Sequence, residues 1–358
     1  MQASQPNFLR LLSLKAGVHI QMNAKSRCLV ECNNLNIHYQ LSKNTVLKAV
    51  DNVSLKIFPK EIVGLVGESG SGKTTLGKSL IRLLRPTSGS ISFDGSDITN
   101  LSRAQLKTCR KHMQLIFQDP FSSLHPRLKI RDILAEPFLI QKQGDSKSID
   151  EAVSELLEQV GLNQELKDRY SSELSGGQCQ RVGIARALAL NPQFIVADEP
   201  VSALDVSVQA QILNLIRKLQ KQRELALLFI SHDLTVVRFL CDRVLVMYLG
   251  QIVEEADKSR LFAKPAHPYT IALMSAKNHG RAEAGSKRQR IILSGDQPSP
   301  INPPTGCRFH TRCWLRTKLG NPSKCETMEP EPVSVENNHR SRCHFAGELA
   351  NGTYEGNE

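Results

Sequence analysis

The chain has 358 residues, of which 40% are hydrophobic and 23% charged, and it carries a formal net charge of +11. That length accommodates one large α/β domain with an appendage, or two modest domains. No apolar run approaches the roughly 20 residues that cross a bilayer, so membrane contact is expected only through a partner or the surface. The basic excess is spread thinly, without arginine-rich tracts and interleaved aromatics, which argues against nucleic acid as a partner.

The N-terminal segment 1–27 is predicted to be a disordered extension. Acidic residues are absent before Glu31, and Arg10 interrupts the apolar core that a signal peptide needs. Two interpretations stay open, a true extension or an assigned start upstream of an initiator at Met22. The folded domain is expected to begin near Cys28.

The first third of the chain predicts strands around a glycine-rich turn. Leu29–Gln40 and Ala49–Phe58 have the alternation of strands with one buried face. Ile62–Val66 is a continuous apolar run, which is typical of a parallel strand covered on both faces. A helical pattern, Thr75–Leu84, follows the turn, and Ser90–Gly95 predicts a further short strand.

The pattern between residues 101 and 190 is mainly helical. Ile149–Val160 is amphipathic, and Ser148 with Glu151 has the spacing of a capping box at its start. This region is expected to form a helical unit of its own.

The following part of the chain alternates strands and helices. Phe194–Ala197 and Leu227–Ile230 predict buried strands on either side of a long helix, Ser207–Gln222. This alternation indicates an α/β fold with a parallel sheet. Lys277–Lys287 is polar and contains glycine, as a linker would be, and after Pro298 the composition turns to Pro and Cys.

The glycine-rich turn fits the phosphate-loop pattern G-x-x-x-x-G-K-[ST] between a strand and a helix. Its glycines let backbone N–H groups curl around phosphate oxygens, and the helix adds its positive end. Lys73 is expected to reach the β- and γ-phosphates, and Thr74 to place its hydroxyl on Mg²⁺. The predicted phosphate-binding residues are Gly67, Ser69, Gly70, Ser71, Gly72, Lys73, Thr74 and Thr75.

Two adjacent carboxylates follow the buried strand Phe194–Ala197. At the carboxyl end of such a strand Asp198 can hold Mg²⁺ through water, and Glu199 can then polarise the attacking water. The alternative is a plain acidic turn before Pro200. The phosphate loop upstream favours the catalytic interpretation.

A second glycine-rich helix start lies at Leu174–Gln178, with the sequence Leu-Ser-Gly-Gly-Gln. Free N–H groups at a helix start suit an anion, although a plain loop into a helix has the same composition. Because the phosphate loop already serves one nucleotide, a second anion site suggests a nucleotide held by another protomer.

Leu174–Gln178 resembles the signature motif of the ABC transporter ATPases, and further motifs of that family stand in the expected order. The resemblance implies that Tyr39 stacks on adenine and that Gln118 reaches Mg²⁺ and the attacking water. It also implies that Asp205 lies in the D-loop and that His232 contacts the γ-phosphate. The signature residues Ser175, Gly176, Gly177 and Gln178 would bind ATP held by a partner subunit.

The resemblance implies a P-loop nucleotide-binding domain over residues 28–276. Its expected parts are a RecA-like core, an antiparallel β subdomain and a helical subdomain at about 101–190. Two such domains sandwich ATP head to tail, and their closure and opening drive membrane subunits. The implied catalytic residues are Glu199, His232 and Gln118, and the implied Mg²⁺ ligands are Thr74, Gln118 and Asp198.

Further stretches are similar to the oligopeptide/dipeptide importer ATPases, namely Phe117–Pro126, His267–Thr270 and Ile292–Cys313. Thr75–Lys78 resembles their F-type subunit, which implies a D-type second ATPase as heterodimer partner. The same resemblance implies two permeases, an extracytoplasmic peptide-binding protein and a place on the cytoplasmic face of the inner membrane. The alternatives are an importer of nickel, glutathione or another small solute, and a soluble ABC ATPase acting on DNA or ribosomes.

The segment 277–358 is predicted to be a linker and an extension with a four-cysteine site, formed by Cys307, Cys313, Cys325 and Cys343. Four thiolates suit Zn²⁺ or a [4Fe–4S] cluster, and their spacing does not decide between the two. Disulfides are disfavoured in a reducing compartment. The resemblance implies the [4Fe–4S] cluster, although the gap before Cys325 is longer than is usual in the family.

Overall fold

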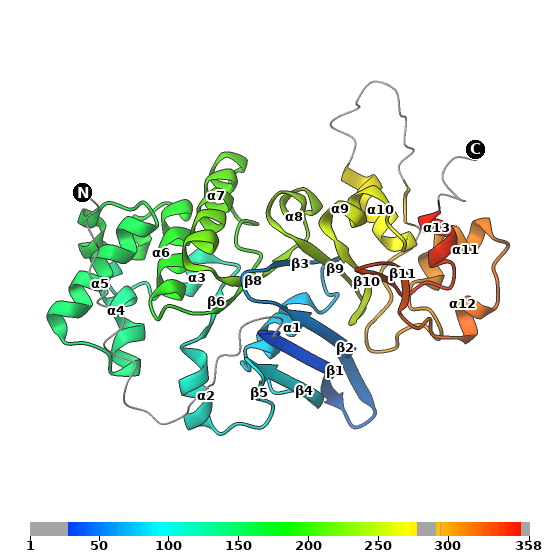
Figure 1. Cartoon of the computed structure of the whole chain (residues 1–358), viewed down its shortest axis with the longest axis horizontal. Coiled ribbons are helices and arrows are strands. Elements are labelled where there is room, and N and C mark those ends of the chain that lie inside the picture. The colour runs from blue at the N-terminus through cyan, green and yellow to red at the C-terminus, as the bar shows by residue number, and fades with distance from the viewer. Residues whose placement is uncertain (1–27, 278–290, 294, 352–358) are drawn as a thin grey trace.

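The computed structural model describes residues 28–277, 291–293 and 295–351. The predicted extension 1–27, the choice of Met22 as initiator and most of the predicted linker therefore lie outside the described residues. Within the described ranges, the strands form a four-stranded sheet and an eight-stranded sheet, and helices cover the larger one (Figure 1). No helix in these ranges combines the length and apolarity needed to cross a membrane.

The smaller sheet is antiparallel, as expected for the β subdomain. A long hairpin of β1 (Val30–Ser42) and β2 (Thr45–Ile57) pairs through β1 with β4 (Ser88–Phe93), and β5 (Ser96–Asp97) completes the edge. The hairpin places Ala49 of β2 against the glycine-rich turn at Gly72.

The larger sheet has the strand order β11-β12-β10-β9-β3-β8-β7-β6. Its central strands run parallel, and four of them are buried at every position, as continuous apolar runs predict. The parallel strands are β3 (Ile62–Val66), β6 (Met113–Ile116), β7 (Phe194–Asp198), β8 (Ala226–Ser231) and β9 (Arg243–Tyr248). The expected α/β fold with a parallel sheet is confirmed.

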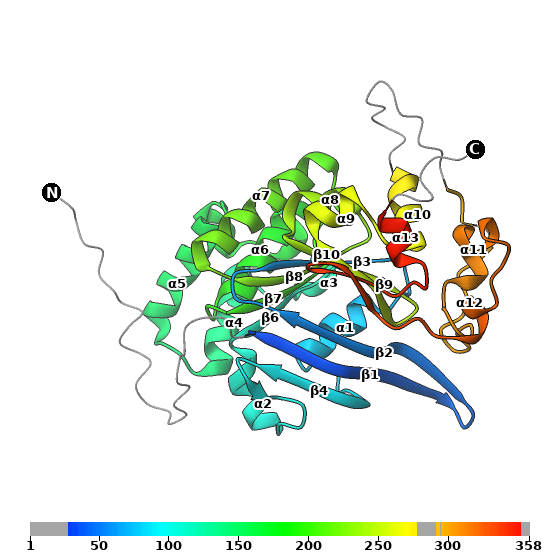
Figure 2. The same cartoon turned by 45° about the vertical axis from the view of Figure 1, so that its right-hand side comes forward.

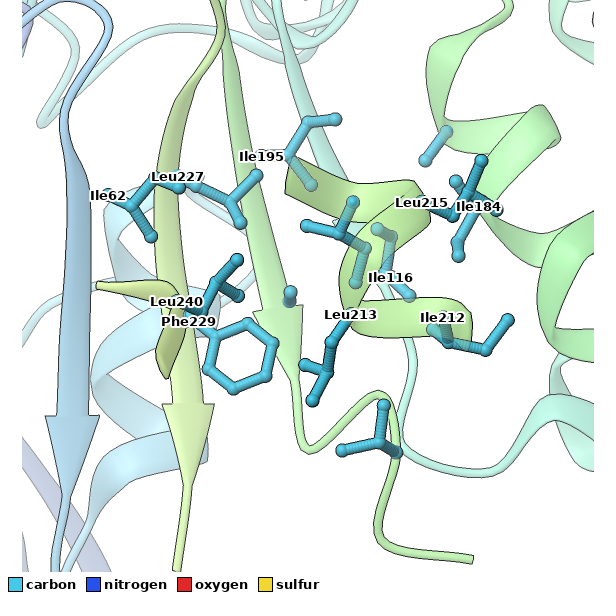
Figure 3. Close-up of a cluster of buried hydrophobic side chains, with 14 of the residues drawn as sticks. Ile62, Ile116, Ile184, Ile195, Ile212, Leu213, Leu215, Leu227, Phe229 and Leu240 are labelled. Atoms are coloured by element: carbon cyan, nitrogen blue, oxygen red, sulfur yellow. The ribbon is translucent and has the colours of Figure 1, made fainter. Parts of the chain in front are cut away.

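Successive residues of the central strands point to opposite faces of the large sheet and enter two separate cores. Ile62 and Val66 lie in one core, whereas Val63 and Leu65 lie in the other. Figure 3 shows the first core, in which side chains of β3, β7 and β8 meet those of the helices on that face. The second core joins the sheet to α1 and to the antiparallel sheet.

The helices divide between these two faces. α1 (Lys73–Leu80) packs on the second core, whereas α6 (Gly176–Leu188), α7 (Val206–Arg223) and α8 (Leu234–Leu240) pack on the first. The region expected to be the helical subdomain contains α2 (Arg103–Arg110), α3 (Pro120–Ser123), α4 (Ile130–Gln141), α5 (Ser146–Gln159) and two 3-10 turns, Gln164–Asp168 and Ser171–Glu173. Of these, α2 packs against the second core through Cys109. The helices that begin at the two glycine-rich segments therefore lie on opposite faces of the sheet.

The helical region differs from the sequence prediction in two respects. Its expected span, 101–190, contains strand β6, which is too short for periodicity to reveal. The prediction of a capping box at Ser148 and Glu151 is wrong, because α5 begins earlier, at Ser146. Asp145 is the N-cap and exchanges hydrogen bonds with Ser148, so Glu151 has no part in the cap.

The C-terminal segment joins the large sheet. β10 (Gln251–Asp257) pairs antiparallel with β12 (His339–Ser341), which pairs with β11 (Val333–Glu336). The helical elements here are α9 (Lys258–Ala263), α10 (Pro268–Lys277), a 3-10 turn at His310–Arg312, α11 (Trp314–Lys318), α12 (Lys324–Thr327) and α13 (Ala346–Ala350). Figures 1 and 2 both place α11, α12 and α13 at the end of the molecule away from α4 and α5. The domain boundary after residue 276 stays a prediction, and the strand pairing shows that both segments share one sheet.

Candidate functional site

The glycine-rich turn after β3 adopts a backbone that its glycines make accessible. Gly72, the N-cap of α1, has φ of +103°, and a Cβ there would lie 2.1 Å from the carbonyl oxygen of Ala49. Only glycine fits such a position without strain. Gly72 also has no side chain to cap α1, so the first N–H groups of the helix have no side-chain cap and are available to an anion.

Lys73 lies folded into this loop. Its Nζ donates to the carbonyl oxygens of Gly67 at 2.9 Å and of Glu68 at 2.8 Å, and the side chain is 5% exposed. Burial lowers the pKa of Lys73, although Glu199, Asp198 and Glu68 act against that shift. A phosphate group in the loop would give the ammonium a counter-charge that the neutral carbonyls do not supply.

Thr74 and Asp198 meet across the loop. The Thr74 hydroxyl donates to Asp198 Oδ1 at 2.8 Å, and Asp198 ends β7 with 4% exposure. Burial raises the pKa of Asp198, partly offset by that hydrogen bond. A bound divalent cation would act in the opposite direction and favour the carboxylate. A hydroxyl and a carboxylate side by side are ligands that suit Mg²⁺.

Glu199 is held by groups at or just after the carboxyl ends of β6 and β8, the two strands that flank β7. Its φ of +44° is unusual for a residue other than glycine, and its N–H donates to the Ile230 carbonyl of β8 at 3.0 Å. Gln118 Nε2 donates to Glu199 Oε2 at 3.2 Å, and His232 Nδ1 lies 3.2 Å from the same oxygen. The three residues predicted to be catalytic are thus brought together beside the phosphate loop.

Two further residues of the predicted motifs, Tyr39 and Asp205, make no side-chain hydrogen bond within the described part of the chain. Tyr39 lies on β1 with 37% exposure, as a side chain that stacks on a ligand would. Asp205 is the N-cap residue of α7, and its side chain makes no capping hydrogen bond. Their roles stay predictions.

The signature residues form a local structure at the start of α6. Ser175 Oγ accepts from the Gln178 N–H at 3.3 Å, and Gln178 Oε1 accepts from the Ser175 N–H at 2.9 Å. A Cβ on Gly177 would meet Val208 Cγ1 at 2.7 Å, so the glycine lets α6 approach α7 closely. Within the described part of the chain, no hydrogen bond connects Ser175–Gln178 with the phosphate loop.

All four cysteines of the extension line one cavity of about 10 Å³, together with His267, His310 and His344. Burial raises the pKa of Cys307 to about 12 and that of Cys313 to about 11, and it also raises the pKa values of Cys325 and Cys343. Among the described residues, no group of three or more His, Cys, Asp or Glu side chains is placed to hold a metal ion. The four cysteines therefore lie around one cavity, and their role as ligands stays a prediction.

Sequence reasoning missed two residues that contact the phosphate loop although they are far from it in the sequence. Tyr269 of α10 and Arg312 of the extension both bind Glu68, which occupies a variable position of the loop pattern. Arg312 is 244 residues away from Glu68 in the chain, and no periodicity connects the two. The available signal was the segment Cys307–Cys313, in which each of the two arginines is next to a cysteine.

The fold and this constellation of residues define a P-loop protein that binds and hydrolyses a nucleoside triphosphate. The sequence profile of the ABC transporter family matches residues 50–202, and that of the oligopeptide/dipeptide transporter C-terminal region matches residues 253–319. The chain therefore belongs to the ATP-binding proteins of the ABC transporter family, in its oligopeptide/dipeptide branch. It is an ATPase and the motor subunit of an ABC importer.

Similar proteins cover most of the chain. An ATP-binding protein of Brucella ovis, named for peptide import, is 52% identical over 306 residues, which span 86% of this chain and 94% of the relative. The oligopeptide transport ATP-binding protein AppF of Bacillus subtilis is 50% identical over 300 residues, 84% of this chain and 90% of AppF.

Two solved structures share the fold. The dimeric ATP-binding cassette MJ0796, in a post-hydrolysis state with ADP and Pi, has a TM-score of 0.59 at 30% identity and covers 64% of this chain and 98% of its own. The cbiO1 subunit of the ABC transporter complex cbiONQ from Clostridium perfringens has a TM-score of 0.60 at 26% identity, covering 72% of this chain and 96% of its own.

Proposed function

We propose that this subunit powers the import of oligopeptides or dipeptides. The names of the relatives in Brucella ovis and Bacillus subtilis refer to peptide import and oligopeptide transport. The match of residues 253–319 to the C-terminal region of oligopeptide/dipeptide transporters supports the same cargo class.

The observation that carries the hydrolytic mechanism is the binding of Gln118 and His232 to one oxygen of Glu199, at 3.2 Å each. In this proposal the Glu199 carboxylate accepts a proton from the attacking water as the oxygen bonds to the γ-phosphorus, and the bond to ADP breaks. Gln118 and His232 fix the orientation of that carboxylate. His232 then contacts the γ-phosphate from the exposed side of the site.

The remaining nucleotide contacts follow from the loop. Lys73 exchanges its carbonyl partners for β- and γ-phosphate oxygens, and Tyr39 stacks on the adenine. Thr74, Gln118 and Asp198 are the residues that would hold Mg²⁺, which neutralises charge on the β- and γ-phosphates when it is bound. Thr74 and Asp198 lie 2.8 Å apart at this position, which supports their assignment as neighbouring ligands.

The signature residues complete the site of a second ATPase subunit in our proposal. Ser175–Gln178 begin a helix on the face of the sheet opposite α1. This separation supports a site in which the phosphate loop of one subunit and Ser175–Gln178 of another bind the same nucleotide. Asp205 of the D-loop would lie at the same contact. The Thr75–Lys78 sequence supports a D-type ATPase as that partner. Co-purification of the two ATPases in a 1:1 complex tests the heterodimer, and a symmetric pair of this chain alone would contradict it.

We place the working assembly at the cytoplasmic face of the inner membrane, with two permeases and an extracytoplasmic peptide-binding protein. Family membership supports this arrangement. The test is uptake of a labelled tripeptide by cells that lack the gene. Wild-type chain should restore uptake, and Glu199→Gln should not. ATPase activity stimulated by ribosomes or DNA, and not by reconstituted permeases, would instead establish a non-transport role.

We also propose that the four cysteines hold a [4Fe–4S] cluster rather than Zn²⁺. A zinc ion needs four sulfurs at about 2.3 Å from one point, whereas a cluster binds each sulfur through a different iron. The four thiols line a common cavity, which supports one shared site for them. Because the cavity measures about 10 Å³, binding requires the cysteine-bearing segments to move apart. Anaerobically purified protein should be brown and contain iron, and colourless protein with stoichiometric zinc would overturn this choice.

A further inference from the structure

The second residue of the phosphate loop is fixed at three points. The backbone N–H of Glu68 donates to the Tyr269 hydroxyl at 2.8 Å, and its carbonyl oxygen accepts from Lys73 Nζ at 2.8 Å. Its carboxylate binds the guanidinium of Arg312. Glu68 thus connects the lysine of the loop to two residues that belong to the C-terminal part of the chain.

The pairing of Arg312 with Glu68 is of the two-pronged kind. Nη1 donates to Oε2 at 2.8 Å, and Nη2 donates to Oε1 at 3.2 Å. Parallel donation by a planar guanidinium fixes the direction of a carboxylate as well as its distance. The Arg312 side chain is 9% exposed, so water screens this pair little.

A cluster of aromatic side chains lies beside the segment that carries Arg312. The rings of Tyr248, Tyr269 and Phe309 lie with centroids 4.7 to 5.4 Å apart, which joins β9, α10 and the extension. Trp314 Nε1 donates to the Pro268 carbonyl at 3.0 Å and fixes α11 to the start of α10. The Arg312 N–H donates to the Phe309 carbonyl at 3.0 Å, so these contacts fix the segment that carries the guanidinium.

A second arginine of the same segment contacts the antiparallel sheet. Arg308 binds the carboxylate of Asp51 on β2 and the carbonyl oxygen of Leu249. Asp51 also lies 3.1 Å from His38 Nε2, and His38 precedes Tyr39 in β1. The extension thus contacts the phosphate loop through Arg312 and the antiparallel sheet through Arg308.

We propose that Arg312 is a positioning residue for ATP binding, which acts through Glu68 to hold the phosphate loop in its binding conformation. The C-terminal extension then forms a structural part of the nucleotide site. This inference rests on the proposed assignment of Gly67–Thr75 as the ATP phosphate site. It requires no group bound to the cysteines.

The expected consequence is a change in affinity more than in turnover. The loop N–H groups contact the phosphates both in the bound ATP and in the transition state. A loss of loop order therefore weakens both states alike, which raises KM and leaves kcat largely unchanged. A residue that merely stabilises the extension would not produce this division.

The test is a double-mutant cycle on the full-length chain, purified without oxygen, with a fluorescent ATP analogue and Mg²⁺ as the probe. Arg312→Gln and Glu68→Gln should each raise the Kd by about tenfold, as the loss of one charge-assisted pair predicts. The Kd of the double variant should exceed that of either single variant by no more than about twofold, because both changes remove the same interaction. Arg312→Lys keeps the charge without the fork and should give an intermediate Kd.

The matched control is Arg316→Gln, which removes a guanidinium that binds Glu326 within the extension and leaves the loop contacts intact. Its Kd should equal that of the wild type. Independent, multiplying effects of Arg312→Gln and Glu68→Gln would overturn the inference, as would a wild-type Kd for Arg312→Gln. If Arg312→Gln does not fold, Arg312→Lys takes its place in the cycle. Lys73→Ala tests the proposed ATP site separately from the role of Arg312. Intact ATP binding in that variant would overturn the assignment of the loop as the ATP site.

Discussion

Two helices of this chain begin in a glycine-rich segment, and their first turns are built differently. At the start of α1, Gly72 offers no side chain, so no cap occupies the first N–H groups. At the start of α6, Ser175 and Gln178 satisfy each other's N–H groups at 3.3 and 2.9 Å. Similar composition thus gives one helix start that is open to an anion and one that is already capped.

The two starts also differ in the range of the contacts that hold them. The phosphate loop is held by distant residues: the Gly250 N–H donates to the Ser71 carbonyl at 2.9 Å, and Arg312 binds Glu68. The start of α6 is held by its own capping box. We infer that the first is preorganised for a nucleotide, whereas the second gains its ligand only when another subunit brings one.

The variant with the largest expected effect removes the base beside the first helix start. Glu199→Gln keeps the shape of the side chain and loses its ability to accept a proton, so ATP hydrolysis should fall by a factor of at least about a hundred. ATP binding should persist, and an ATP-bound dimer should accumulate. Steady-state ATPase assays and size-exclusion chromatography with ATP measure the two effects.

The control for that variant is Glu224→Gln, the same chemical change at an exposed pair with Lys60. Its turnover should match that of the wild type. Wild-type turnover in Glu199→Gln would contradict the assignment of Glu199 as the base. The site beside the start of α1 would then have no identified catalytic base.

The sequence predicted the local features of this comparison well. The loop pattern located α1, and Ser175–Gln178 located the start of α6 within one residue, because both signals are short and local. Thr74 and Asp198 were both predicted to hold Mg²⁺, the first from the loop pattern and the second from its place at the end of a buried strand, and the structure brings them together. The contacts of Arg312 and Tyr269 with Glu68 did not follow, since they depend on how the extension packs over a long sequence separation.

The second-largest effect is expected at the other helix start. Ser175→Asp retains an N-cap oxygen and suits the helix dipole, but it places a carboxylate where the phosphate of a partner's ATP would lie. Such like-charge contact costs several kcal/mol, so hydrolysis should fall by about a hundredfold while nucleotide binding to the single subunit is unchanged.

Ser175→Asn is the matched control, because it caps the helix equally well and adds no charge. It should retain most of the activity. Equal losses in both variants would show that the hydroxyl itself is required, and a loss of nucleotide binding by the isolated Ser175→Asp subunit would contradict the assignment of this site to the partner's ATP.

A third variant tests the distant support of the phosphate loop. Burial acts to raise the pKa of Asp51, but the bound Arg308 guanidinium outweighs it and holds that pKa below 3.8. Asp51→Asn leaves Arg308 buried without its counter-charge and should reduce the free energy of unfolding by about 2 kcal/mol at pH 7. Urea denaturation measures it.

The sign of the pH dependence follows from the lowered pKa of Asp51. The stabilisation by the carboxylate is fully present above its ordinary pKa of 3.8 and is lost as the pH falls through the lower, folded-state value. The difference between wild type and Asp51→Asn should therefore be constant at neutral pH and shrink below pH 3.8. A difference that grows with acidity would contradict the pairing of Asp51 with Arg308.

The smallest expected effect isolates the local character of the α6 start. Ser175→Ala removes the side-chain oxygen that accepts from the Gln178 N–H, and the loss of an N-cap costs about 1 kcal/mol of unfolding free energy. Because this cap contacts nothing in the phosphate loop, the Kd of the single subunit for ATP should not change. Ser175→Asn should restore the stability. If Ser175→Ala instead weakened ATP binding by the isolated subunit, the two helix starts would be coupled within one chain, and the difference in their range of contacts would not separate their functions.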